Sequence, residues 1–162
     1  MAEALAAIAV VASIAQLADF GLRLAYKGSI VSKQIKCAPN ILVSVSSEVA
    51  LIGTTLHQLS SELNNAKYKE ILDPEALRKI DVLTSACKET FKSLDDLLTA
   101  TMQDGERNKE KMFRRLASSL KLRKTIVELT EKRDCLCRLK HDLMLMTQIL
   151  VLACQRRYLT NR

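Results

Sequence analysis

The sequence predicts an all-α fold: a four-helix bundle with an additional short helix and a long C-terminal helix. The 162 residues include only four Gly and two Pro, fewer turn residues than a sheet protein of this size needs. Apolar residues also recur in alternating steps of three and four over long stretches, the spacing of one helix face. The length suits a single domain that spans residues 1–162.

The first helix is expected over Met1–Lys27, and its segment Ala4–Ala18 carries no charge. Apolar side chains occupy more than one of its faces, so the helix is predicted either to be a central core helix or to enter lipid. The uncharged segment is shorter than the roughly 20 residues of a membrane span, so a span would have to take in the charged residues that follow. Gly28 is expected to end the helix, and the sequence leaves open whether residues 29–36 continue it.

Pro39 opens the second predicted helix, because proline suits the first helical position. Asp73-Pro74 is expected to cap the third, and Asp104-Gly105 is expected to form a turn after it. The apolar seam of the second helix is Leu42, Val45, Val49, Ile52, Leu56, Leu59 and Leu63. The buried stripe of the third is Ile80, Leu83, Cys87, Phe91, Leu94 and Leu98.

The short helix is expected over Glu106–Ser118, and the long last helix follows Ser118-Ser119 and reaches about Tyr158. Five leucines recur every seven residues along the last helix: Leu122, Leu129, Leu136, Leu143 and Leu150. A heptad of this kind is typical of a seam that packs within a bundle or between chains.

The net charge of +7 is concentrated at the C-terminal end. Residues 106–162 contain fifteen Lys or Arg and six Asp or Glu, whereas residues 1–63 contain four of each. We expect the densest basic residues either to bind an anionic partner or to form a solvated helix face: Arg107, Lys109, Lys111, Arg114, Arg115, Lys121, Arg123 and Lys124. Only Phe113 adds an aromatic ring among them, which favours lipid headgroups or an acidic protein over nucleic acid.

The five cysteines are odd in number and irregularly spaced, which indicates reduced thiols and a cytoplasmic location. The N-terminus has no basic region of the kind that opens a signal peptide. Cys137 and His141 share a helix face and could both contact one metal ion, but a small buried thiol beside a partly exposed histidine is the simpler interpretation. His57 is expected to be structural, and the Asp95-Asp96 pair to be solvated.

The sequence contains no phosphate-binding glycine motif and no recognisable nucleophile with its base. No catalytic residue, metal or cofactor is therefore expected, and the function is expected to lie in what the helices bind or insert into.

Three segments carry a resemblance to a known family. They are AEALAAIAVVASIAQLADFGLRLAYK at the start, APNILVSVSSEVALIGTTLHQLSSEL over Ala38–Leu63, and SSLKLRKTIVELTEKRDCLCRLKHDLMLMTQ over Ser118–Gln148. They resemble helices of the fungal HeLo and HeLo-like domains, which stand at the N-terminus of STAND (NLR-like) proteins. The resemblance implies an effector of programmed cell death, as in fungal immunity and heterokaryon incompatibility. Such a domain self-associates on activation, reaches the plasma membrane and permeabilises it through its N-terminal helix.

Carried over to this chain, the resemblance assigns the membrane-engaging side chains to Ala4, Leu5, Ile8, Val11, Ile14, Leu17 and Phe20. Glu3 and Asp19 would be the polar elements of that helix and could face a wet lumen in an assembly of several copies. The implied partners are other copies of the chain, anionic membrane lipids and a STAND/NLR-type receptor. Two alternatives stay open: a helical adaptor that oligomerises through the Leu122–Leu150 face without a membrane, and a nucleic-acid binder.

Overall fold

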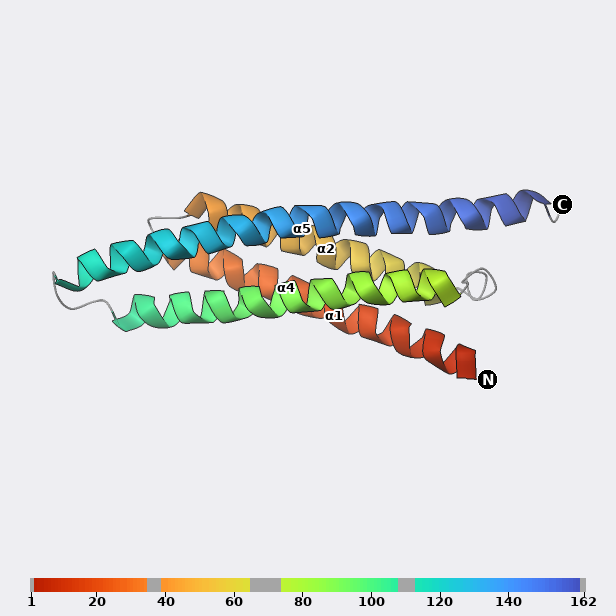
Figure 1. Ribbon diagram of the computed structural model, residues 1–162, viewed down its shortest axis with the longest axis horizontal. Helices are drawn as coiled ribbons and strands as arrows, with labels where there is room; N and C mark the ends of the chain where they lie inside the picture. The colour runs from red at the N-terminus through yellow and green to blue at the C-terminus, as the bar shows by residue number, and fades with distance from the viewer. Residues whose placement is uncertain (1, 35–38, 65–73, 108–112, 161–162) are drawn as a thin grey trace.

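The computed structural model describes the backbone of residues 2–34, 39–64, 74–107 and 113–160, and the side chains of residues 8–33, 40–64, 75–103, 123–153 and 155–156. Within these ranges the chain forms four α-helices and no strand: α1 (Ala2–Gln34), α2 (Pro39–Asn64), α4 (Pro74–Arg107) and α5 (Phe113–Thr160). Figure 1 shows the four lying side by side with alternating direction. The predicted all-α bundle is therefore confirmed.

The helices pack in the cyclic order α1, α2, α5, α4. The most extensive interface joins α1 to α2, followed by α2 with α5, α1 with α4, and α4 with α5. The α4–α5 interface is thus the least extensive of the four. The interfaces of α5 with α2 and with α4 do not involve α1.

The core is largely aliphatic, with Phe91 as a fully buried aromatic residue. All seven residues of the predicted α2 seam are buried, from Leu42 to Leu63. The predicted α4 stripe is also buried, except for Leu83, which is half-buried. The repeated three-and-four spacing therefore identifies the buried faces of both helices correctly, because a helix returns to the same face at that period.

Gly28 does not end the first helix, contrary to the prediction. It is buried in the interior of α1, which continues to Gln34. A Cβ atom built on Gly28 would lie 2.3 Å from the Ser46 hydroxyl oxygen on α2, so the position takes glycine because the two helices approach closely there. A mid-helix glycine costs about 1 kcal/mol relative to alanine, and the packing on both sides of it offsets that cost.

The predicted boundaries around the short helix are also wrong. Residues 104 and 105 are helical and belong to α4, which ends at Arg107, so the expected turn is absent there. The start of α5 at Phe113 and its unbroken course through Ser118-Ser119 leave no separate short helix among the described residues of this stretch. Two serines lower helix propensity by only about 0.5 kcal/mol each, too little to interrupt a helix of 48 residues.

Candidate functional site

Helix α1 divides into two segments with different surroundings. Residues 2–13, here called the N-terminal segment, contain no fully buried side chain among those described: Ile8 is 54% exposed and Ala9, Ala12 and Ser13 are exposed, whereas Val10 and Val11 are half-buried against the core. The docked segment runs from Ile14, the first fully buried residue among the described side chains, to Gln34. In Figure 1 the red end of α1 diverges from the other helices. Among the described side chains of this end, Ile8 is thus exposed, while Val10 and Val11 lie at the edge of the core.

The docked segment is held by close packing against α2 and α4. A Cβ atom on Gly21 would lie 2.7 Å from a ring carbon of Phe91 and 3.5 Å from the Cα of Gly53. A Cβ on Gly53 would lie 3.2 Å from the Ala18 carbonyl oxygen. Two glycines thus allow α1 and α2 to approach closely, while the buried Phe91 ring fills the space beside them. Phe20 meets that ring edge to face, with 6.1 Å between the ring centroids.

Polar contacts join the same helices. Lys27 on α1 donates to the Asp95 carboxylate on α4 at 2.5 Å and to the Thr99 hydroxyl at 2.7 Å. Asp95 is therefore paired rather than solvated as predicted. His57 Nε2 on α2 lies 3.1 Å from Asp19 Oδ1 on α1, and both side chains are substantially exposed. An exposed pair of this kind contributes at most about 1 kcal/mol, so close packing is the main restraint on α1.

The predicted membrane-engaging residues consequently fall into different environments. Ile8 is exposed, Val11 and Phe20 are half-buried, and Ile14 and Leu17 are buried. The side chains of Ala4, Leu5 and Glu3 lie outside the described residues. The stretch Ile8–Lys33 is long and apolar enough to cross a bilayer, and about 33% of the apolar window within it is buried. Core helices of globular bundles share this composition, so the difference in burial along α1 is the more informative observation.

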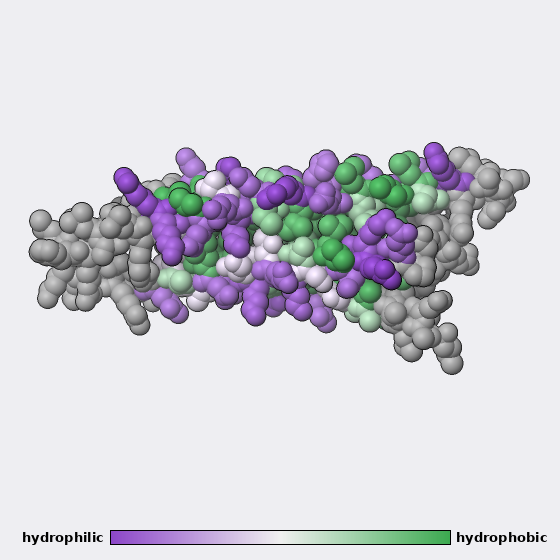
Figure 2. Space-filling view, viewed as in Figure 1, coloured by the Kyte–Doolittle hydropathy of each residue, from purple (hydrophilic) through white to green (hydrophobic). Residues whose placement is uncertain are grey.

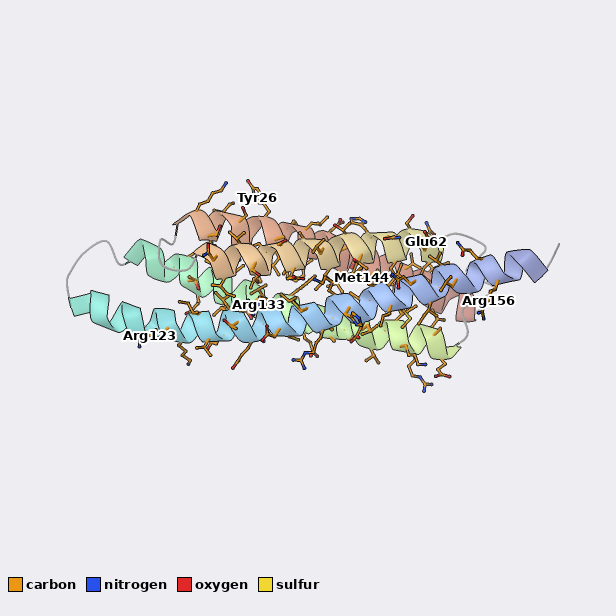
Figure 3. All side chains as sticks on the ribbon, turned by 90° about the horizontal axis from the view of Figure 1, so that it is seen from above. Tyr26, Glu62, Arg123, Arg133, Met144 and Arg156 are labelled. Atoms are coloured by element: carbon orange, nitrogen blue, oxygen red, sulfur yellow. The ribbon has the colours of Figure 1, made fainter. Side chains whose placement is uncertain are left out.

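The basic cluster lies far from the N-terminal segment. Arg107 ends α4, and Arg114, Arg115 and Lys121 belong to the first turns of α5. Figure 1 places the end of α4 and the start of α5 opposite the start of α1, and Figure 3 shows Arg123 and Arg156 near opposite ends of α5. At 1.5 Å per residue, the 34 residues of α4 span about 50 Å. The two predicted lipid-contacting features are therefore separated by most of the length of the bundle.

Two of the eight residues in the predicted basic cluster have described side chains. Arg123 and Lys124 are exposed, and Lys124 lies 3.9 Å from Glu128 one turn along the helix. The side chains of the other six predicted headgroup-binding residues, Arg107, Lys109, Lys111, Arg114, Arg115 and Lys121, lie outside the described residues.

The heptad leucines of α5 face the interior of the bundle. Leu129, Leu136, Leu143 and Leu150 are all buried, whereas the side chain of Leu122 is not described. A second chain could not use this face without opening the bundle. The described α5 side chains available to a partner are different ones, and five of the large apolar ones are exposed: Val127, Met144, Leu145, Ile149 and Leu152.

The cysteines and histidines form no candidate metal site in the described part of the chain. Cys137 is half-buried and His141 exposed, and no group of three or more potential metal ligands occurs among the described side chains. Burial raises the pKa of the Cys87 thiol to about 12, with a smaller contribution from nearby Cys135. Cys87 is therefore a protonated thiol at neutral pH and a poor nucleophile.

A further polar contact between helices was not anticipated from the sequence. Lys140 on α5 donates to the Glu48 carboxylate on α2 at 2.5 Å, and both side chains are largely buried. The hydrogen bond to Glu48 raises the pKa of Lys140. Lys140 and Glu48 are 92 positions apart in the sequence, and Lys27 and Asp95 are 68 apart. No local sequence pattern could therefore predict either pair. Both pairs join helices, but only the Lys27–Asp95 pair involves α1.

Comparisons with protein-family models, with curated proteins and with solved structures yield no match.

Proposed function

We propose that this chain is a HeLo-like cell-death effector domain, which self-associates at an anionic membrane and permeabilises it through α1. The observation that supports this function best is the decrease of burial toward the start of α1, where Ile8 is exposed and Val10 and Val11 pack against the core at its edge. An isolated exposed apolar residue needs no explanation. A helix end whose sequence is uncharged from Ala4 to Ser13, and which carries an exposed Ile8, is a candidate for contact with lipid.

The length of α1 divides the proposed insertion into two steps. The 12 residues of the N-terminal segment span about 18 Å at 1.5 Å per residue, whereas the hydrocarbon core is about 30 Å thick. The segment can therefore bury itself in one leaflet while the bundle stays closed. A full span requires the docked segment to leave the bundle through about Leu24, which breaks the contacts of Gly21 with α2 and α4.

The cyclic packing order supplies a reason why α1 can be released without loss of the whole fold. The α2–α5 and α4–α5 interfaces exclude α1, and the Glu48–Lys140 pair holds α2 against α5. Release of α1 would leave these three helices in contact. Asp19 would lose its His57 partner and become available to a wet lumen, as expected for a polar residue of an inserted helix. In this proposal the protein resides in the cytoplasm and moves to the plasma membrane on activation.

Deletion of residues 2–13, with Met1 retained, tests the proposed function. The deletion removes the half-buried Val10 and Val11 but keeps every fully buried residue described in α1, so the bundle is expected to fold. Release of an entrapped dye from vesicles that contain phosphatidylserine should fall to the buffer rate, while helicity by circular dichroism stays in proportion to chain length. Dye release that equals that of the full chain would contradict the proposed function.

A helical adaptor that acts through protein contacts is the second candidate function. The exposed apolar side chains of α4 and α5, which include Val82 and Ile149, favour it. The adaptor would use these side chains rather than the Leu122–Leu150 face, whose described leucines are buried.

A further inference from the structure

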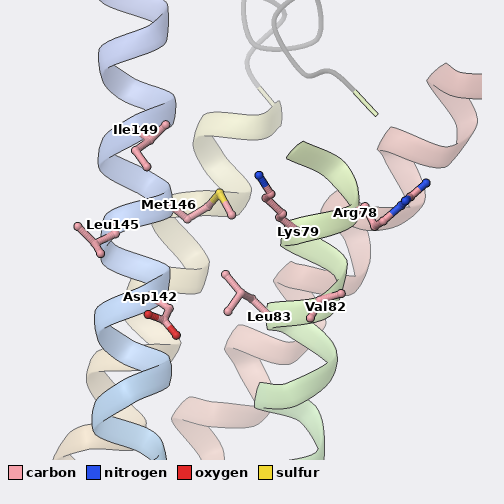
Figure 4. Close-up of a pocket in the computed structure, with 8 residues that line it drawn as sticks. All are labelled: Arg78, Lys79, Val82, Leu83, Asp142, Leu145, Met146 and Ile149. Carbon is pink, nitrogen blue, oxygen red and sulfur yellow. The ribbon is translucent and has the colours of Figure 1, made fainter. Parts of the chain in front are cut away.

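A groove separates α4 from α5, the two helices whose interface is the least extensive. It encloses about 440 Å³ and is lined by Val82 and Leu83 of α4, by Met146 and Ile149 of α5, and by charged residues at its margins. Figure 4 shows Leu83 and Met146 extending toward each other across the groove. Val82 is 63% exposed and Ile149 is 62% exposed. Large apolar side chains thus remain in water at the opening of this groove.

The outward face of α5 changes character where the groove lies. Glu131, Asp134, Arg138 and His141 make this face polar along the middle of the helix. From Leu145 onward the same face becomes apolar, with Leu145, Ile149 and Leu152 exposed at helical spacing. Figure 2 shows green side chains gathered over one half of the bundle on this side. The apolar surface is therefore a localised patch.

The charges that border the groove have opposite signs on its two sides. Arg78 and Lys79 lie on the α4 side and Asp142 on the α5 side, and Figure 4 shows Arg78 extending from α4 away from α5. A two-fold axis that runs along the groove would place α4 of one copy against α5 of the other, so that the basic margin of each copy faces the acidic margin of the other. Isologous dimers have this reciprocal arrangement, in which the same patch serves both partners. The groove is therefore complementary to itself in charge and apolar at its centre.

We propose that the α4–α5 groove is the site at which a second copy of this chain docks, in a two-fold dimer centred on Val82 and Ile149. An anionic lipid surface fits the groove less well, because it favours a margin of positive charge alone and would face Asp142. The patch is small in comparison with stable dimer interfaces, which bury about 800 Å² per partner. The dimer is therefore expected to be weak and concentration-dependent. This inference does not depend on membrane activity.

Sedimentation equilibrium of the full chain over a series of concentrations tests the dimer in the absence of lipid. Wild type should show reversible monomer–dimer behaviour, and Ile149→Asp should weaken the association at least about tenfold, because it places a charge at the apolar centre. Val127→Asp is the matched control: Val127 is 57% exposed on the same helix but lies outside the groove. This variant should associate as wild type does. Monomeric wild type at every concentration, or equal loss in both variants, would overturn the proposal.

A charge exchange tests the proposed two-fold arrangement itself. Arg78→Asp and Asp142→Arg should each weaken the dimer about fivefold through repulsion, and the double variant should regain most of the wild-type affinity. A double variant whose loss of binding free energy equals the sum of the two single losses would overturn this arrangement. Dimerisation that is lost on deletion of residues 2–13, but kept in Ile149→Asp, would assign the contact to α1 and overturn the groove as its site. Failure of the vesicle assay alone would affect only the proposed function.

Discussion

Substitution of Ile8 by aspartate is expected to abolish vesicle leakage without destabilising the fold. Ile8 is 54% exposed in the bundle, so the carboxylate remains in water and the free energy of unfolding should change by less than about 0.5 kcal/mol. In the membrane the same aspartate costs about 3 kcal/mol near the centre of a helix, which is more than a hundredfold in the insertion equilibrium. The measurement is dye release from phosphatidylserine-containing vesicles, together with urea unfolding of the free protein.

Val127→Asp again provides the control for this experiment. It replaces a β-branched residue of similar exposure by the same charge, but on α5 rather than α1. Its leakage rate should equal that of wild type. Equal inhibition by both substitutions would mean that added negative charge, rather than the apolar surface of α1, controls leakage. Full leakage by Ile8→Asp would remove the N-terminal segment from the mechanism.

Replacing Phe91 by alanine is expected to cause the largest loss of stability among the substitutions considered. The ring is fully buried, touches the backbone of α1 at Gly21 and packs edge to face on Phe20. Truncation of a buried Phe to Ala lowers the free energy of unfolding by about 3–5 kcal/mol. Because much of the lost contact joins α4 to α1, the cost of releasing α1 should fall too, and leakage should become faster.

Leu136→Ala separates the two effects of Phe91→Ala. Leu136 is fully buried on α5, a helix that packs on α2 and α4. Its truncation should lower the unfolding free energy by about 2–5 kcal/mol but leave the cost of releasing α1 nearly unchanged. Faster leakage in Phe91→Ala than in Leu136→Ala is therefore expected. Equal rates would indicate that leakage follows global unfolding, and Phe91→Leu offers a milder version if the alanine variant does not fold.

The hydrophobic spacing predicts the buried faces well and the helix ends poorly. Every residue of the α2 seam is buried, because the face that the hydrophobic period predicts is the face that packs on the other helices. Gly28 and Gly105, by contrast, lie inside helices where a stop and a turn were predicted. The cost of a glycine in a helix is about 1 kcal/mol. At Gly28 the close approach of Ser46 on α2 outweighs it, and that contact cannot be seen in the local sequence.

The candidate site was only partly predictable for a similar reason. Helix α1 is apolar on several faces, so its sequence pattern does not predict which apolar residues are buried. It does not predict that Ile14 is fully buried while Ile8 is exposed. The pair Lys27–Asp95 joins residues remote in sequence. The apolar patch on α5 did have a signal. Leu145, Ile149 and Leu152 lie at helical spacing beside the heptad seam. Together with the seam they make the apolar face of α5 wider than a single buried stripe.

The most direct test of the account is to lock α1 onto α2 and measure leakage. The exposed, adjoining side chains of Asp19 and His57 are suitable points: both become cysteine, and a short bis-maleimide with a cleavable disulfide joins them. Cys37, Cys135, Cys137 and Cys154 are replaced by serine, while buried Cys87 is left in place because its raised pKa makes it unreactive. A single-ended maleimide serves as the control for the modification itself.

We expect the locked protein to bind vesicles through its N-terminal segment but to release no dye above the buffer rate. Reduction of the linker should restore leakage to the rate of the control, because α1 can then leave α2. A locked protein that leaks as fast as its reduced form would show that the membrane is breached with the bundle closed, and would contradict the release of α1.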